Sequence, residues 1–138
     1  MQDHINNDLY KTSYAYKNRA KSKLDIIVQQ NLESWCSALS NVSGVYLITD
    51  TVNGKLYVGS ATGEEGIWQR WCQYSSNGHG GNKELIAVLK EKGADYSMNF
   101  QYSILEIADT HTSAAAVLER ESYWKKVLCC REHGYNAN

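Results

Sequence analysis

The sequence lacks any run of about 18 consecutive apolar residues, so we expect no membrane-spanning helix. Its first residues, MQDHINNDLYK, contain no apolar core, so we expect no secretory signal peptide. No Cys-X-X-Cys pair occurs among the four cysteines, which argues against a disulfide framework and against a structural zinc site. A reducing, cytoplasmic compartment fits this cysteine usage best.

An excess of either charge is also missing, because 14 Lys and Arg residues stand against 15 Asp and Glu residues. The totals therefore exclude a strongly basic nucleic-acid binder, and any binding to phosphate must come from a local patch. Hydrophobic residues make up 43% of the chain and charged residues 21%, which argues against wholesale disorder. The length of 138 residues suits one domain with a short accessory segment.

One basic patch lies near the start of the chain, where no acidic residue occurs between Leu9 and Leu24. Its members are Lys11, Lys17, Arg19, Lys21 and Lys23. The segment is either the solvated entry to a helix or an arm that contacts phosphates. We assign residues 1–40 to this arm and a following helix, and residues 41–138 to the main domain.

The pattern of apolar residues predicts an α+β fold. Helical spacing indicates helices over residues 21–39, 64–74, 82–92 and 112–130. Runs rich in β-formers indicate strands over residues 45–49, 56–58 and 98–107. The Asn53-Gly54 pair between the first two strands is a strong hairpin signal. We therefore expect a small sheet covered by helices, with an N-terminal helical extension.

Tyrosine occurs ten times in the chain, whereas phenylalanine occurs once and proline not at all. A two-residue turn at Asn53-Gly54 would pair Asp50 with Tyr57, and Tyr46 and Tyr57 would then share one face of the sheet. A register shift of two residues preserves that shared face, whereas a shift of one destroys it. The two phenols serve either core packing or chemistry.

Two charged residues fall on the buried sides of predicted helices. Glu121 lies within the apolar stripe of the last helix, where it would form a buried salt bridge, for example to Arg70 or Arg120, or bind a metal such as Mg²⁺ or Mn²⁺. Arg70 leans toward the core between Ile67 and Tyr74, either packing its stem or clamping a phosphate. With the two phenols, this set suits cleavage of a phosphodiester.

Several ordered motifs extend this pattern over residues 42–138. They are Gly44-Val-Tyr46, Tyr57-Val-Gly59-Ser-Ala61, Ile67-Trp-Gln-Arg-Trp71, His79-Gly-Gly-Asn-Lys-Glu-Leu85, Ser103-Ile-Leu-Glu106, Glu119-Arg-Glu-Ser-Tyr-Trp124 and Gly134-Tyr-Asn136. Together they resemble the signature of the GIY-YIG nucleases. The resemblance implies a three-stranded antiparallel sheet flanked by helices and a DNA-cleaving activity that needs one divalent ion, Mg²⁺ or Mn²⁺.

The resemblance also implies roles for individual residues. Its motif positions correspond to Tyr46, Tyr57, Arg70, the metal-binding Glu121, and Asn136. One tyrosine would activate water, and we favour Tyr46 over Tyr57. Some members carry a histidine where this chain has Tyr74, and His79 either supplies that polar role or caps the next helix.

The implied partner is DNA, which Lys55 and Lys83 would contact together with the basic patch of the arm. Family members usually attach this domain to a separate DNA-reading module, and little of this chain lies outside residues 42–138. A reading domain or partner is therefore expected to be separate. Two other hypotheses are a non-catalytic DNA- or protein-binding module on the same scaffold, and a core in which the tyrosines and Glu121 satisfy one another. The DNA target and the oligomeric state do not follow from the sequence.

Overall fold

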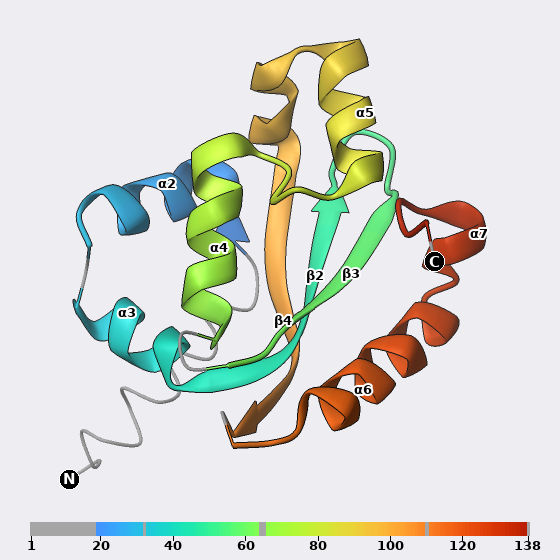
Figure 1. Ribbon diagram of the computed structural model, residues 1–138. Helices are drawn as coiled ribbons and strands as arrows, with labels where there is room; N and C mark the ends of the chain where they lie inside the picture. The colour runs from blue at the N-terminus through green and yellow to red at the C-terminus, as the bar shows by residue number, and fades with distance from the viewer. Residues whose placement is uncertain (1–18, 32, 64–65, 110, 138) are drawn as a thin grey trace, which may run out of the picture.

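The computed structural model describes residues 19–31, 33–63, 66–109 and 111–137 (Figure 1). The predictions made for Lys11 and Lys17, and for the side chain of Arg19, lie outside this description. Among the described helices, none has the length and apolar character needed to cross a membrane.

An antiparallel sheet forms the centre of the fold. Its main strands are β2 (Val42–Asp50), β3 (Leu56–Ala61) and β4 (Phe100–Asp109), and the short β1 (Arg19–Ala20) pairs with β4. The order is β1-β4-β2-β3, with β2 hydrogen-bonded to both β3 and β4. The expected three-stranded sheet is confirmed, and β1 extends it at the edge away from β3.

Helices cover both faces of the sheet (Figure 1). The described helices are α2 (Lys21–Gln29), α3 (Glu33–Ser40), α4 (Gly66–Asn77), α5 (Lys83–Lys92), the 3-10 helix η1 (Ala94–Asn99), α6 (Ala114–Val127) and α7 (Cys130–His133). Helices α2, α3 and α4 lie on one side of the sheet, and α6 and α7 lie on the other. The sheet therefore separates two packed layers.

The ends of these helices follow local chemistry. The side chains of Asn82 and Ser113 accept hydrogen bonds from Leu85 N and Ala116 N at the starts of α5 and α6. Helix α5 ends at Gly93, which has a φ of 98°. The prediction of one helix over residues 21–39 is wrong, because α2 ends before Asn31, whose φ of 47° is left-handed. Asparagine is one of the few residues that adopt this conformation readily.

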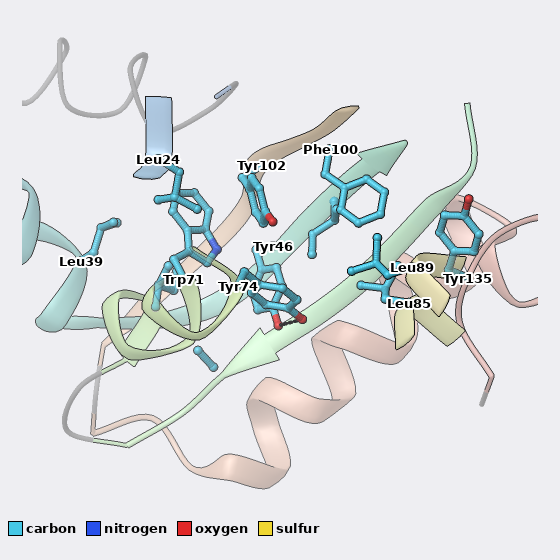
Figure 2. Close-up of a cluster of buried hydrophobic side chains, with 13 residues drawn as sticks. Leu24, Leu39, Tyr46, Trp71, Tyr74, Leu85, Leu89, Phe100, Tyr102 and Tyr135 are labelled. Atoms are coloured by element: carbon cyan, nitrogen blue, oxygen red, sulfur yellow. Dashed lines mark hydrogen bonds between the residues drawn. The ribbon is translucent and has the colours of Figure 1, made fainter. Parts of the chain in front are cut away.

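The main core lies between α4 and the sheet (Figure 2). Trp71, Tyr74 and Tyr102 are fully buried there, and the ring centroid of Tyr102 lies 5.8 Å from that of Trp71 and 5.8 Å from that of Tyr74. Leu24 of α2 and Leu39 of α3 belong to the same buried cluster. A boundary at residue 40 stays a prediction, but both N-terminal helices pack on the core of the main domain.

The β2–β3 hairpin differs from the expected turn. Asp50 N donates to Lys55 O at 2.9 Å, so residues 51–54 form a four-residue loop instead of a two-residue turn. The side chains of Asp50 and Asn53 accept from Val52 N and Lys55 N, which stabilises the longer loop. Because the register moves by two residues, Tyr57 pairs with Ile48, and Tyr46 and Tyr57 still share a face.

A buried carboxylate joins three segments at the end of β2. Asp50 is fully buried, and its Oδ2 accepts from Tyr96 Oη at 2.7 Å and from Tyr135 Oη at 2.6 Å. Tyr96 comes from η1 and Tyr135 from the segment after α7. Asp50 therefore ties the β2–β3 hairpin to two distant parts of the chain.

We predict that Asp50→Ala lowers the free energy of unfolding by about 2–4 kcal/mol, because two phenol hydroxyls lose a buried charged acceptor. Urea denaturation measures this change. Asp109→Ala is the matched control, since the Asp109 carboxylate is exposed and its partner among the described residues is the nearby His111; its effect should stay within about 0.5 kcal/mol. Equal effects of the two substitutions would contradict this role for Asp50.

Candidate active site at the edge of the sheet

Tyr46 projects from the central strand β2 across Gly59 of β3, its cross-strand partner. A Cβ atom on Gly59 would lie 2.5 Å from the hydroxyl oxygen of Tyr46, so only glycine leaves room for this ring. Tyr46 is fully buried, and its hydroxyl lies 2.8 Å from the hydroxyl of Tyr74 (Figure 2). Burial raises the pKa of Tyr46 to about 12. Tyr46 is therefore a neutral phenol at physiological pH.

Arg70 brings a guanidinium to this phenol pair. Its Nη2 lies 3.4 Å from Tyr46 Oη and 3.3 Å from Tyr74 Oη, and its Nη1 donates to the carbonyl of Gly80 at 3.2 Å. Burial by itself would lower the pKa of Arg70, but the neighbouring phenols, Tyr46 first among them, raise it. Nη1 also donates to Gln73 Oε1 on the same helix. Arg70 is therefore a partly buried, permanent cation whose contacts to the two phenols are long.

Tyr57 is the outermost of the three clustered phenols, because it is partly exposed whereas Tyr46 and Tyr74 are buried. Burial raises its pKa, and so does the charge of Glu121, while hydrogen bonds with Tyr74 and Asn82 and the charge of Arg70 lower it. The net effect is a raised pKa, so Tyr57 is a neutral phenol unless further positive charge is brought to it.

Glu121 approaches β3 from the opposite face of the sheet. Its Oε1 accepts a hydrogen bond from Ser60 Oγ, and its Oε2 lies 2.6 Å from Lys125 Nζ. The expected salt bridge exists, but its partner is Lys125 of the same helix. Arg120 instead pairs with Glu106, and Arg70 faces the phenols. The Glu121 side chain is 15% exposed, and its partner Ser60 belongs to the same strand as Tyr57.

A metal site of Glu121 would have a single protein carboxylate. In the part of the chain that the structure describes, no group of three or more His, Cys, Asp or Glu side chains is arranged to hold a metal. Mg²⁺ commonly uses one or two carboxylates and takes its remaining ligands from phosphates and water. The donor set of Glu121 therefore fits an ion shared with a phosphate substrate.

Asn136 has a positional role next to Tyr57. Its side-chain Oδ1 accepts from Val58 N at 2.8 Å and its Nδ2 donates to Val58 O at 2.9 Å. The oxygen and the nitrogen of the side-chain amide thus both bond to the backbone of β3, and Asn136 is 5% exposed. Asn136 thus replaces a neighbouring strand at the outer edge of β3 and holds the residue after Tyr57 in place.

His79 and Lys21 make contacts of other kinds. His79 Nδ1 accepts from Gly81 N at 2.9 Å within its own loop, and the loop touches Arg70 through Gly80. A catalytic role for His79 stays a prediction. Lys21 is buried, and its ammonium binds Asp25 and the carbonyl of Ser75. The prediction that Lys21 contacts phosphates is therefore wrong. The side chains of Lys23, Lys55 and Lys83 are exposed, as phosphate contacts require.

Tyr74, Ser60 and Lys125 also belong to the site, although their sequence patterns did not predict it. Tyr74 is buried in the core, and its hydroxyl bonds to that of Tyr46. Its spacing of one helical turn from Arg70 was the available signal. The same spacing relates Lys125 to Glu121, whereas the contact of Ser60 depends on how α6 packs on β3.

Known proteins resemble this chain in sequence and in fold. The family model of the GIY-YIG catalytic domain matches residues 42–136. Intron-associated endonuclease 1 of Enterobacteria phage T4 is 34% identical over 94 residues, which are 68% of this chain and 36% of the phage protein. This chain thus spans about a third of the length of that curated relative.

Two solved structures have the same fold. The catalytic domain of the homing endonuclease I-TevI matches with a TM-score of 0.52 and 33% identity, over 70% of this chain and 98% of that chain. A mutant catalytic domain of the intron endonuclease I-TevI matches with a TM-score of 0.52 and 31% identity, over 70% of this chain and 94% of that chain.

The raised pKa of Tyr46 predicts a loss of stability at high pH. Tyr46 titrates at about 12 when folded and near 10.0 when unfolded, so its contribution is complete below pH 10 and disappears as the pH rises to 12. Over that interval, the free energy of unfolding should fall about 2–3 kcal/mol more in the parent than in Tyr46→Phe. Urea titrations at several pH values measure the difference. Tyr123→Phe, which alters an exposed tyrosine, should behave like the parent.

Proposed function

The chain belongs to the GIY-YIG family of catalytic domains, and we propose that it acts as a metal-dependent endonuclease on phosphodiester bonds of DNA. One observation carries the proposal: β3 bears Tyr57, which packs against the core that holds Tyr46 and Tyr74 beside Arg70, and the same strand bears Ser60, which donates to Glu121. A cation, a partly exposed phenol and a metal-type carboxylate around one strand are the parts that phosphodiester hydrolysis needs.

Arg70 is the group we propose to bind the scissile phosphate. The contacts of its Nη2 to the phenols, at 3.3 and 3.4 Å, are long for hydrogen bonds, so little is lost when Nη2 turns to a phosphate oxygen, while Nη1 is held by Gln73 and Gly80. A planar guanidinium can hold two such oxygens at once. Stabilisation of charge that develops on the phosphate is worth about 10²–10³ in rate when one such donor is removed.

We propose that Tyr57, and not Tyr46 as the sequence favoured, is the base: its phenolate form, which the charge of Arg70 favours, accepts a proton from the attacking water and becomes the neutral phenol. Tyr46 is fully buried and its hydroxyl is engaged by Tyr74 and Arg70, so it has no surface to offer a water molecule. Tyr57 retains exposure and has the same cation nearby. Tyr46 and Tyr74 would then position Arg70 behind it.

Glu121 is the residue we propose to hold the divalent ion, Mg²⁺ or Mn²⁺. When bound, such an ion supplies a Lewis acid for phosphate oxygens and lowers the pKa of bound water. Ser60 orients the carboxylate through its hydrogen bond to Oε1. Outer partners of this kind fix the direction of a ligand.

Recognition of a particular DNA sequence is proposed to require a DNA-reading domain or partner in addition to this domain. The related phage endonuclease is a longer protein, of which the match covers 36%. The exposed Lys23, Lys55 and Lys83 would supply contacts to phosphates that do not depend on sequence.

The experiment is nicking of a supercoiled plasmid with Mg²⁺, with Mn²⁺ or with EDTA. We expect metal-dependent nicking by the parent, and a loss of about 10²-fold or more in Arg70→Ala and Glu121→Gln. Glu119→Gln is the matched control, because Glu119 is exposed on the same helix. Nicking by Glu121→Gln at the parental rate would refute the assignment. Salt-sensitive DNA binding without nicking by the parent would favour the non-catalytic module instead.

The two tyrosines give a separate prediction. Removing a general base costs about 10²–10⁴-fold in rate, so Tyr57→Phe should lose that much activity in single-turnover nicking while remaining as stable as the parent. Tyr46→Phe should lose less activity, because Arg70 keeps its contacts to Tyr74 and Gly80. The reverse order of rates would make Tyr46 the base.

A further inference from the structure

A buried lysine neighbours the proposed metal carboxylate. Lys125 lies one helical turn after Glu121 on α6, with 2.6 Å between its Nζ and Glu121 Oε2. The side chains are 7% and 15% exposed, so this is not the solvated pair usual for this spacing on a helix surface. Lysine is rarely buried unless its charge is paired. The next residue, Lys126, is exposed.

The contacts of Glu121 leave no oxygen of its carboxylate unused. Oε1 accepts from the hydroxyl of Ser60, a neutral donor, while Oε2 faces the ammonium of Lys125. A divalent ion that binds Glu121 must therefore displace the ammonium or bind beside a like charge. A like charge at this distance disfavours the second cation, and the low exposure of both side chains limits screening by water and salt.

We propose that Lys125 is a built-in counter-ion of Glu121 that weakens the binding of divalent metal to the DNA-free protein. This inference rests on the proposed role of Glu121. Lys125 neutralises the carboxylate when no DNA is present, and the negative phosphate that arrives with DNA offsets the charge of the ammonium. Metal and DNA then bind together, and Lys125 acts as a positioning residue through Glu121.

The test is a Mn²⁺ titration of the DNA-free protein, followed by the electron paramagnetic resonance signal of free Mn²⁺. Lys125→Met keeps an unbranched stem and removes the charge, and Lys126→Met removes a charge from the neighbouring exposed position. We expect Lys125→Met to bind Mn²⁺ at least about tenfold more tightly than the parent and Lys126→Met to match the parent. The gain should disappear in the double variant Lys125→Met/Glu121→Gln.

Two results would overturn the proposal. One is a Mn²⁺ affinity of Lys125→Met equal to that of the parent, and the other is a gain that survives in the double variant. Lys125→Gln, which still donates to Glu121, provides a second variant if Lys125→Met does not fold. In the parent itself, saturating Mg²⁺ should shift the side-chain ¹⁵N resonance of Lys125 and leave that of Lys126 unchanged; an unshifted Lys125 resonance also overturns it.

The two proposals fail in different ways. If Glu121→Gln nicks plasmid like the parent, the assignment of the metal carboxylate fails, and the role of Lys125 fails with it. If nicking depends on Glu121 but Lys125→Met binds Mn²⁺ no better, only the counter-ion is refuted. A large loss of DNA binding by Lys125→Met in EDTA would assign Lys125 to a phosphate instead and would also refute the counter-ion.

Discussion

The close pairing of Tyr46 with Gly59 is the constraint on which the rest of the site depends. The ring of Tyr46 occupies the space where any residue other than glycine at position 59 would have its Cβ atom. This packing directs its hydroxyl to Tyr74 and Arg70, and the same register puts Ser60 on the opposite face, where Glu121 binds it. One strand pair thus supplies both halves of the site.

The charges of the site are distributed across β3 instead of being paired with each other. Arg70 lies among neutral phenols whose ionisation burial suppresses, and within the described ranges no carboxylate pairs with it. Glu121 has Lys125 as its own partner on the other face. The positive charge of Arg70 therefore remains available on one side of the strand, whereas the charge of Glu121 is neutralised on the other.

Much of this arrangement could be predicted because it follows from short-range periodicities. The prediction that Tyr46 and Tyr57 share a face is confirmed although the predicted turn is wrong, because a register shift of two residues keeps each side chain on the same face. Asn82 and Gly93 bounded α5 through local hydrogen bonding and backbone conformation. The break at Asn31 was missed because asparagine only permits a left-handed residue and does not require one.

The remaining errors concern side chains whose partners are distant or compete. Lys21 belonged to a basic run, but its neighbour Ser75 is brought to it by packing of α2 on α4. The preference for Tyr46 as base ignored burial, which depends on the whole core. The salt-bridge partner of Glu121, Lys125 instead of an arginine, is set by rotamers and tertiary packing, which residue spacing alone does not specify.

The clamp of Asn136 on Val58 also bears on the order in which the molecule is made. Tyr46, Tyr57 and Arg70 leave the ribosome long before Asn136, yet β3 gains the hydrogen bonds along its outer edge only when that residue arrives. Until then, a nascent chain exposes the strand edge next to Tyr57. β3 therefore gains this outer-edge support only after every helix and strand described above has been synthesised.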